Sequence, residues 1–186
     1  NEIGYAFSSS WLRLDITGYA SQWRDKGVRI SYNNAEGVRS YANITGMNAL
    51  HIGIESSFIA KIKGDKVIIN GGASIGNWKW TKDVNGIIFN ELTQEKTELK
   101  LYLENLAIGD APQTTLFLGA RVEPIKNLFF AADFTYYDRL YAAFDPERRT
   151  NPDDRSQSWK LPDFSLIDIH AGYSRRFKFV NASLKG

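Results

Sequence analysis

The segment from Gly109 to Pro146 holds two long runs of alternating residue types, joined by a short Pro-containing connection over residues 123–127. One face of the second run holds Leu128, Phe130, Ala132, Phe134 and Tyr136. The other face holds Phe129, Ala131, Asp133, Thr135, Tyr137 and Arg139. A period of two residues indicates a β-strand rather than a helix. Each run has about ten residues, roughly twice the usual strand length, and about ten tilted residues cross a bilayer. The sequence predicts a long hairpin with one apolar face and one mixed polar face.

The same alternation marks the rest of the chain. We expect strands over residues 2–7, 11–23, 51–62, 67–80, 115–122, 128–139, 164–173 and 179–186. Tight turns are expected at residues 8–10, 63–66, 123–127 and 174–178, and long irregular stretches over residues 24–50, 81–111 and 140–163. Short and long connections therefore alternate. This is typical of an up-and-down antiparallel barrel with turns at one rim and long loops at the other.

Alternating faces alone do not separate such a barrel from a soluble β-sandwich. The long strands, the sorting of loops by length and the lack of charge in the middle of the apolar rows favour a transmembrane barrel. A net charge of +2 gives no bulk attraction to nucleic acid. The absence of cysteine excludes disulfides and thiolate metal sites. No apolar run approaches the length of a transmembrane helix.

Several short segments, spread over nearly the whole chain, resemble TonB-dependent outer-membrane receptors. They are WRDK at 23–26, ITGMNALHIGIE at 44–55, GNWKW at 76–80, IGDAPQ at 108–113, YYDRLYA at 136–142, SQSWKLP at 156–162 and DIHAGY at 168–173. SQSWKLP followed by DIHAGY is the tightest match, and each segment taken alone is weakly specific.

The resemblance implies an all-β fold, a transmembrane antiparallel up-and-down β-barrel of about twenty-two strands around an N-terminal plug domain. Residues 1–186 are then a partial barrel domain of about eight consecutive strands, with the plug, the TonB-contacting segment and the final strand outside this chain. The chain starts at Asn1 without a Met and stops at Gly186 within an alternating run, so we expect both ends to be cut points of a longer protein. We also expect a curved, open sheet that other segments of the same protein complete.

The function implied by the resemblance is import of a scarce nutrient of the siderophore, metal-complex, cobalamin or glycan class. The location is the outer membrane of a Gram-negative bacterium, and neither enzymatic activity nor a cofactor is expected. The expected partners are outer-membrane lipid, the plug domain of the same protein, the TonB complex through the missing N-terminal part and, where one exists, a surface-exposed lipoprotein. Nucleic acid is not expected as a partner.

The candidate ligand contacts are polar or aromatic residues of the inward-facing rows and the long loops. They are Trp78, Trp80, Asp133, Tyr137, Arg139, Arg148, Arg149, Trp159, Asp168 and His170. A water-filled barrel wall whose charges pair among themselves would place Asp133, Asp168 and His170 in the same way. Trp78 and Trp80 suit ligand stacking, but they also suit an aromatic girdle or packing role, which is the commoner one. The two histidines lack metal-ligand spacing, and no motif positions a nucleophile.

Two alternatives remain open from the sequence. A complete eight-stranded barrel with an enzymatic or structural role fits the strand count, and such a small barrel would be filled by side chains. A soluble all-β carbohydrate-binding module fits the high aromatic content of 13%. The apparent cut ends argue against the first alternative, and the strand lengths argue against the second.

Overall fold

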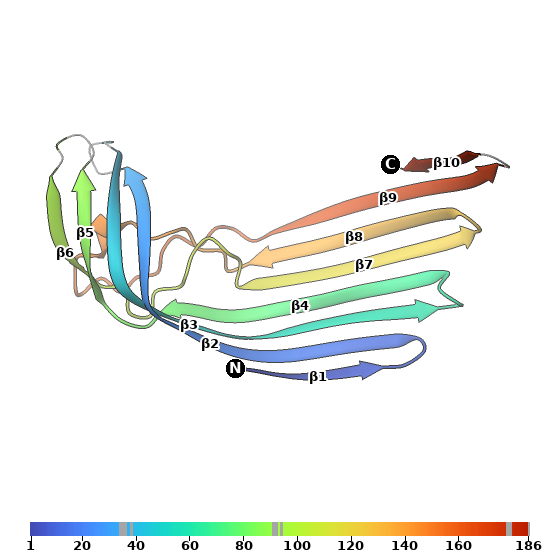
Figure 1. Ribbon diagram of the computed structural model, residues 1–186, viewed down its shortest axis with the longest axis horizontal. Coiled ribbons are helices and arrows are strands. Elements are labelled where there is room, and N and C mark those ends of the chain that lie inside the picture. The colour runs from blue at the N-terminus through green and yellow to red at the C-terminus, as the bar shows by residue number, and fades with distance from the viewer. Residues whose placement is uncertain (34–36, 38, 91–92, 94, 178–179, 186) are drawn as a thin grey trace.

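The computed structural model describes residues 1–33, 37, 39–90, 93, 95–177 and 180–185. These residues form a single antiparallel sheet of ten strands (Figure 1). The strands are β1 (Glu2–Ser8), β2 (Leu12–Asn33), β3 (Arg39–Ile62), β4 (Val67–Trp80), β5 (Val84–Asn90), β6 (Lys96–Leu101), β7 (Thr114–Ile125), β8 (Leu128–Asp138), β9 (Phe164–Phe177) and β10 (Val180–Lys185). In the described part of the chain the one helical element is a 3-10 turn, η1 (Pro146–Arg149).

The described residues include no helix that is both long and apolar enough to cross a membrane.

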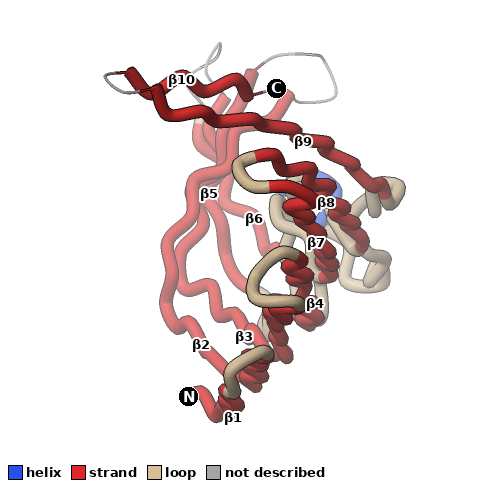
Figure 2. The backbone as a smooth tube through the Cα atoms, turned by 90° about the vertical axis from the view of Figure 1, so that its right-hand side faces the viewer, coloured by secondary structure: helices blue, strands red, loops and turns tan. Residues whose placement is uncertain are grey.

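The main path of the sheet runs β1-β2-β3-β4-β7-β8-β9-β10. Figure 2 shows its strands along an arc, with β1 and β10 at opposite ends. In the described residues β1 pairs with β2 alone and β10 pairs with β9 alone, so the sheet is open. The predicted curved, open, antiparallel sheet is therefore confirmed. It has ten strands rather than about eight, because β5 and β6 lie off the main path.

The two faces of the sheet differ in chemistry as the alternation predicts. The register places Leu118 between Gly71 and Phe134, which belong to the same face. We call this face the apolar face and the opposite one the polar face. Over β1 to β9, the central rows of the apolar face contain no Asp, Glu, Lys or Arg in the described strands. Large side chains stand exposed there, among them Ile3, Ile54, Ile75, Ile167 and Ile169.

The expectation of an irregular stretch over residues 24–50 is wrong. Strand β2 continues to Asn33 and β3 begins at Arg39, so the two strands have 22 and 24 residues. The pairing shifts register between Trp23 and Val28. Asp25 and Gly46 have positive φ angles of 54° and 72°. Such bulges insert an extra residue and change which side chains share a face. A search for strict period-two alternation therefore does not detect these strands beyond the bulge.

The expectation of an irregular stretch over residues 81–111 is also wrong in part. Residues 84–90 and 96–101 form the β5–β6 hairpin, and β5 pairs with residues 40–44 of β3. The sheet therefore forks at β3, whose residues 49–62 pair with β4 instead. We call residues 28–33 of β2, residues 39–44 of β3 and the strands β5 and β6 the outer blade. In Figure 1 it stands at a steep angle to the long strands.

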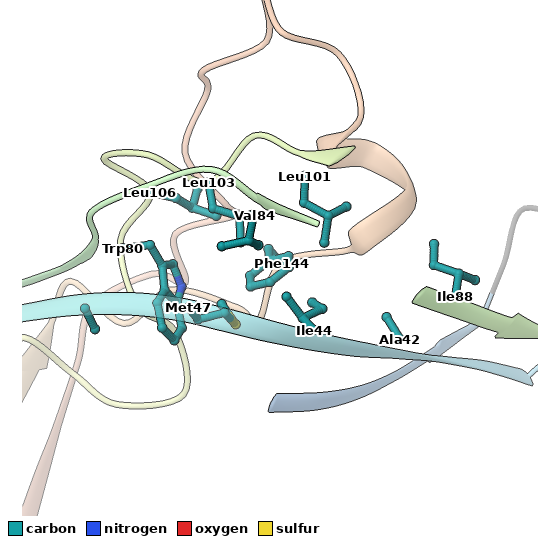
Figure 3. Close-up of a cluster of buried hydrophobic side chains, with 11 residues drawn as sticks. Ala42, Ile44, Met47, Trp80, Val84, Ile88, Leu101, Leu103, Leu106 and Phe144 are labelled. Atoms are coloured by element: carbon teal, nitrogen blue, oxygen red, sulfur yellow. The ribbon is translucent and has the colours of Figure 1, made fainter. Parts of the chain in front are cut away.

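The buried core of the described residues lies where the outer blade meets the neighbouring strand ends and the long loops. Figure 3 shows Phe144, from the loop after β8, lying among Val84, Leu101 and Ile44. The complete core cluster is Ala42, Ile44, Met47, Ala49, Trp80, Val84, Ile88, Leu101, Leu103, Leu106 and Phe144. Burial of these apolar side chains stabilises the blade by about 25 cal/mol for each Å² removed from water. The long loops are thus packed against one side of the blade.

The remaining connections match the predictions made from the sequence, with one exception. The turn at residues 63–66 is present, and Lys63, Gly64 and Asp65 adopt the positive φ angles that such a turn requires. Residues 140–163 are irregular apart from η1. The turn expected at residues 174–178 is wrong for 174–177, because β9 continues to Phe177 and pairs with β10. The ends of the expected strand 179–186 lie outside the described residues.

Candidate functional site

Two groups of side chains on the polar face can meet a ligand or another protein segment. The first lies at the middle of β8 and β9, where Asp133 is directly opposite Asp168. His170 Nε2 lies 3.7 Å from Asp133 Oδ2, and both side chains are about half exposed, at 53% and 49%. This contact is an ion pair only when His170 is protonated. Two like charges at directly opposed positions of adjacent strands repel each other unless water or a partner separates them.

Gly119 on β7 leaves space for the side chain of Asp133, which belongs to the neighbouring strand β8. A Cβ atom at position 119 would lie 2.5 Å from Asp133 Oδ1 and 2.7 Å from Asn70 Oδ1. The missing side chain therefore leaves room for the carboxylate of Asp133 and the carboxamide of Asn70 above β7. In the described residues no group of three or more His, Asp or Glu side chains could hold a metal ion. The group offers hydrogen-bond acceptors.

The second group is aromatic and lies at the outer end of the polar face. Trp78 Nε1 donates a hydrogen bond to Tyr19 Oη at 2.8 Å. The His51 ring lies between two indoles, with ring centroids 4.5 Å from Trp23 and 5.7 Å from Trp78. Lys26 Nζ sits 3.9 Å from the centroid of the Trp23 ring. We call Tyr19, Trp23, His51 and Trp78 the aromatic group.

Two glycines provide the space that the aromatic group occupies. A Cβ atom at Gly53 would lie 2.5 Å from Tyr19 Oη, and one at Gly76 would lie 2.4 Å from Trp78 Nε1. The side chains of Tyr19 and Trp78 therefore lie flat over glycine backbone. His51 Nδ1 is buried and has no hydrogen-bond partner among the described residues. The group presents ring faces that can stack on a planar or sugar ligand.

Sequence reasoning identified only Trp78 of this group. Tyr19, Trp23 and His51 come from two other strands, and they meet Trp78 only through the β2–β3–β4 register. Their shared parity could have predicted that they lie on one face, because the odd-numbered residues of 11–23 and 51–62 all fall on the polar face. The other predicted tryptophan of β4, Trp80, is 7% exposed and belongs to the buried core. Trp80 therefore has the packing role, which is the commoner alternative, and a ligand contact at Trp80 stays a prediction.

Arg139 does not lie on the polar face as predicted. Its φ angle is +53°, and β8 ends at the residue before it. The guanidinium donates through Nε to Thr114 Oγ1 at 2.7 Å and through Nη2 to the carbonyl oxygen of Gln113 at 2.8 Å. Thr114 belongs to the apolar-face row with Leu116 and Leu118. The left-handed backbone at Arg139 ends the alternation and directs its side chain to the rim of the apolar face.

Tyr137 remains on the polar face, where its ring centroid lies 5.1 Å from that of Phe164 on β9. Trp159 is 69% exposed in the loop after β8 and is available to an external molecule. Arg148 is also exposed and lies 3.5 Å from Asp145. Tyr137 is partly buried, whereas Trp159 and Arg148 are exposed, and ligand contact at these three residues stays a prediction.

Arg149 is buried within the loop and bonded to it. It is 7% exposed, and its Nη1 donates to the carbonyl oxygen of Ser156 at 2.6 Å. The loop is further tied to the blade by Arg155, which donates from Nη1 and Nη2 to the two carboxylate oxygens of Asp83 at 2.8 and 3.0 Å. This hydrogen bonding lowers the pKa of Asp83 to about 2. Paired and hydrogen-bonded carboxylates remain ionised at neutral pH.

Comparison of the chain with protein-family models, with curated proteins and with solved structures finds no match. The interpretation of the polar face and of the loops therefore rests on their own chemistry.

Proposed function

We propose that this chain is a wall segment of a TonB-dependent outer-membrane receptor that imports a scarce nutrient. The observation that supports the proposal most is the apolar face of the sheet. Its central rows carry no charge, and isoleucines such as Ile54 and Ile169 are 60% and 76% exposed. Soluble monomers rarely expose contiguous apolar patches larger than a few hundred Å². A bilayer removes the unfavourable hydration of such a face and selects for this absence of charge.

The two ends of the sheet also differ as a membrane barrel requires. Residues 63–66 and residues 126–127 make tight turns at one end. The other end bears the outer blade and the long loop over residues 140–163. In outer-membrane barrels the short turns face the periplasm and the long loops face outside the cell. The unpaired edges of β1 and β10 need further strands, which a longer protein would supply.

The polar face then lines the interior of the receptor. The aromatic group is the part of this face that best suits a ligand, because ring faces stack on planar groups and sugars. Asp133, Asp168 and His170 provide hydrogen-bonding groups for the plug domain or for a passing ligand. The sequence resemblance to TonB-dependent receptors supports this family, and the chemistry of the two faces is consistent with it.

A topology experiment on the full-length protein tests the membrane orientation. We insert the same short epitope tag after Asn151, in the long loop, or after Gly64, in the tight turn, and label intact cells. Antibody should bind the Asn151 tag on intact cells and reach the Gly64 tag only after the outer membrane is permeabilised. Labelling of Gly64 on intact cells would reverse the orientation. Immunoblots of lysed cells control for expression of both tagged proteins.

A solution experiment separates this proposal from a soluble carbohydrate-binding module. Residues 1–186 are expressed alone and examined by gel filtration with and without detergent. We expect aggregation without detergent, because the apolar face and the two sheet edges have no partners. A monodisperse, cooperatively unfolding monomer in the absence of detergent would contradict the membrane assignment. Glycan binding by that monomer would favour the soluble module instead.

A further inference from the structure

The apolar face is hollowed over β1 to β4. An open groove of about 800 Å³ lies there, between larger side chains that stand above a floor of small ones. The register explains the hollow: Ile3 and Ile54 are both paired with Gly18, and Ser56 is paired with Ala73 in the next row. Glycine and alanine leave the space between the isoleucines unfilled. The residues of the floor are Gly18, Ala20, Ser56 and Ala73.

One end of this groove has a fixed positive charge. Arg139 lines the groove together with Ile75 and Asn77. Its Nε and Nη2 are held by Thr114 Oγ1 and the Gln113 carbonyl oxygen, and its Nη1 has no hydrogen-bond partner among the described residues. The guanidinium is thus immobilised in place while one edge stays available. An immobilised guanidinium binds a phosphate with a smaller entropy cost than a mobile side chain.

The charges next to this cation are shared. Asp138, the residue before Arg139, pairs with Lys160 at 2.7 Å and also interacts electrostatically with Arg139, so one carboxylate is divided between two cations. Glu2 also lines the groove, but its Cα partner is Tyr19, which belongs to the polar face. A ligand for the groove should therefore combine an alkyl chain with an anion at one end.

We propose that this groove binds one acyl chain of a phosphate-bearing membrane lipid, with the lipid phosphate at Arg139. The alkyl chain fills the hollow above Gly18 and Ala73, and the phosphate accepts from the free edge of the guanidinium. Strand β8 ends at Asp138, so Arg139 lies at the level where the apolar rows stop and headgroups begin. The inference rests on the proposed function, because it takes the apolar face to be in contact with lipid.

The binding test uses the full-length receptor, purified in dodecyl maltoside and stripped of lipid. Dioleoyl phosphatidic acid is added, and binding is read by native mass spectrometry and by the shift in Tm. Dioleoylglycerol has the same chains without phosphate, inorganic phosphate has no chain, and oleate has a chain with a carboxylate. We expect a one-molecule adduct and a raised Tm with phosphatidic acid alone. Equal binding of inorganic phosphate, of oleate or of dioleoylglycerol would overturn the proposal, as would no adduct at all.

Two variants assign the adduct to this groove. Arg139→Gln removes the cation, and Ala73→Phe fills the hollow; each should lower phosphatidic acid retention at least tenfold. The matched controls lie on the polar face: Arg121→Gln, which loses a cation stacked on Phe129, and Ala131→Phe. Both controls should retain lipid like the natural protein. Retention unchanged in Arg139→Gln and Ala73→Phe would refute the site.

Folding and membrane insertion are measured separately for every variant, by heat-modifiable migration of the outer-membrane fraction. Arg139→Lys keeps the charge but not the planar fork, and it should retain an intermediate amount of lipid, which a purely structural role would not predict. A natural protein that fractionates with the outer membrane yet takes up no phosphatidic acid defeats this inference alone. A natural protein that fractionates as a soluble protein defeats the proposed function as well.

Discussion

Replacing Leu118 by arginine tests the apolar face most directly. Leu118 is at the centre of that face, between Gly71 on β4 and Phe134 on β8. Its side chain is 48% exposed in the isolated chain. The matched substitution is Thr135→Arg, which lies on the adjacent strand and on the polar face. The two variants introduce the same side chain into the same part of the sheet on opposite faces.

The environment of the apolar face sets the size of the effect. If lipid covers this face, Leu118→Arg moves a charge into hydrocarbon and costs about 2–4 kcal/mol near the bilayer midplane. That corresponds to a decrease of about 30-fold to several hundred-fold in the folding equilibrium constant. If water covers it, a half-exposed leucine replaced by arginine changes stability by about 0.5 kcal/mol or less. Thr135→Arg should fall in this small range in either case, because the polar face is solvated.

The assay is guanidinium-induced unfolding of the full-length protein in phospholipid vesicles, followed by tryptophan fluorescence and by heat-modifiable migration. The midpoint for Leu118→Arg should fall well below that of the natural protein, while Thr135→Arg stays close to it. Leu118→Met controls for loss of shape and should cost less than about 1.5 kcal/mol. Equal destabilisation by the two arginine variants would show that the assigned faces are wrong.

Three further predictions concern the outer blade and the aromatic group. Asp83→Asn should lower the local stability of the blade, because it removes the charge from an acceptor of Arg155 and of two backbone amides. The folded-state pKa of Asp83 is depressed to about 2, so this contribution is present above about pH 4 and is lost as the pH falls toward 2. The loss should be measurable as faster amide hydrogen exchange in the blade. An exchange rate that Asp83→Asn leaves unchanged would contradict the prediction. Leu101→Ala, at a fully buried position, should cost about 2–5 kcal/mol and expose the blade to protease while the long strands stay protected. Gly53→Ala should displace Tyr19, since the new Cβ would lie 2.5 Å from its hydroxyl, and an unchanged tryptophan emission spectrum would argue against this arrangement.

The alternation of residue types determined the long strands and their two faces. For β4, β7 and β8 the predicted faces match the register throughout the paired residues, because no bulge interrupts those rows before Val122. The turn at residues 63–66 was equally predictable, since Gly and Asp accept its backbone angles. These features depend on neighbours in the sequence alone. A strand with one apolar face has to place every second side chain on it.

Pairing between strands that are distant in the sequence determined the remaining features of the fold. The bulge around Asp25 shifts the parity of β2, so the strand continues although its alternation is broken. The β5–β6 hairpin becomes a strand pair only because residues 40–44 of β3 offer a free edge.

The candidate site depended on tertiary structure in the same way. The aromatic group comes from three strands, and only their register brings Tyr19 to Trp78. Trp80 has the parity of a polar-face residue, but the loops that cover the blade bury it. Arg139 has that parity too, and its positive φ angle turns it toward Thr114 instead. A period-two pattern specifies the face of a side chain while the backbone stays extended. It cannot specify what covers that face, or where a left-handed residue ends the pattern.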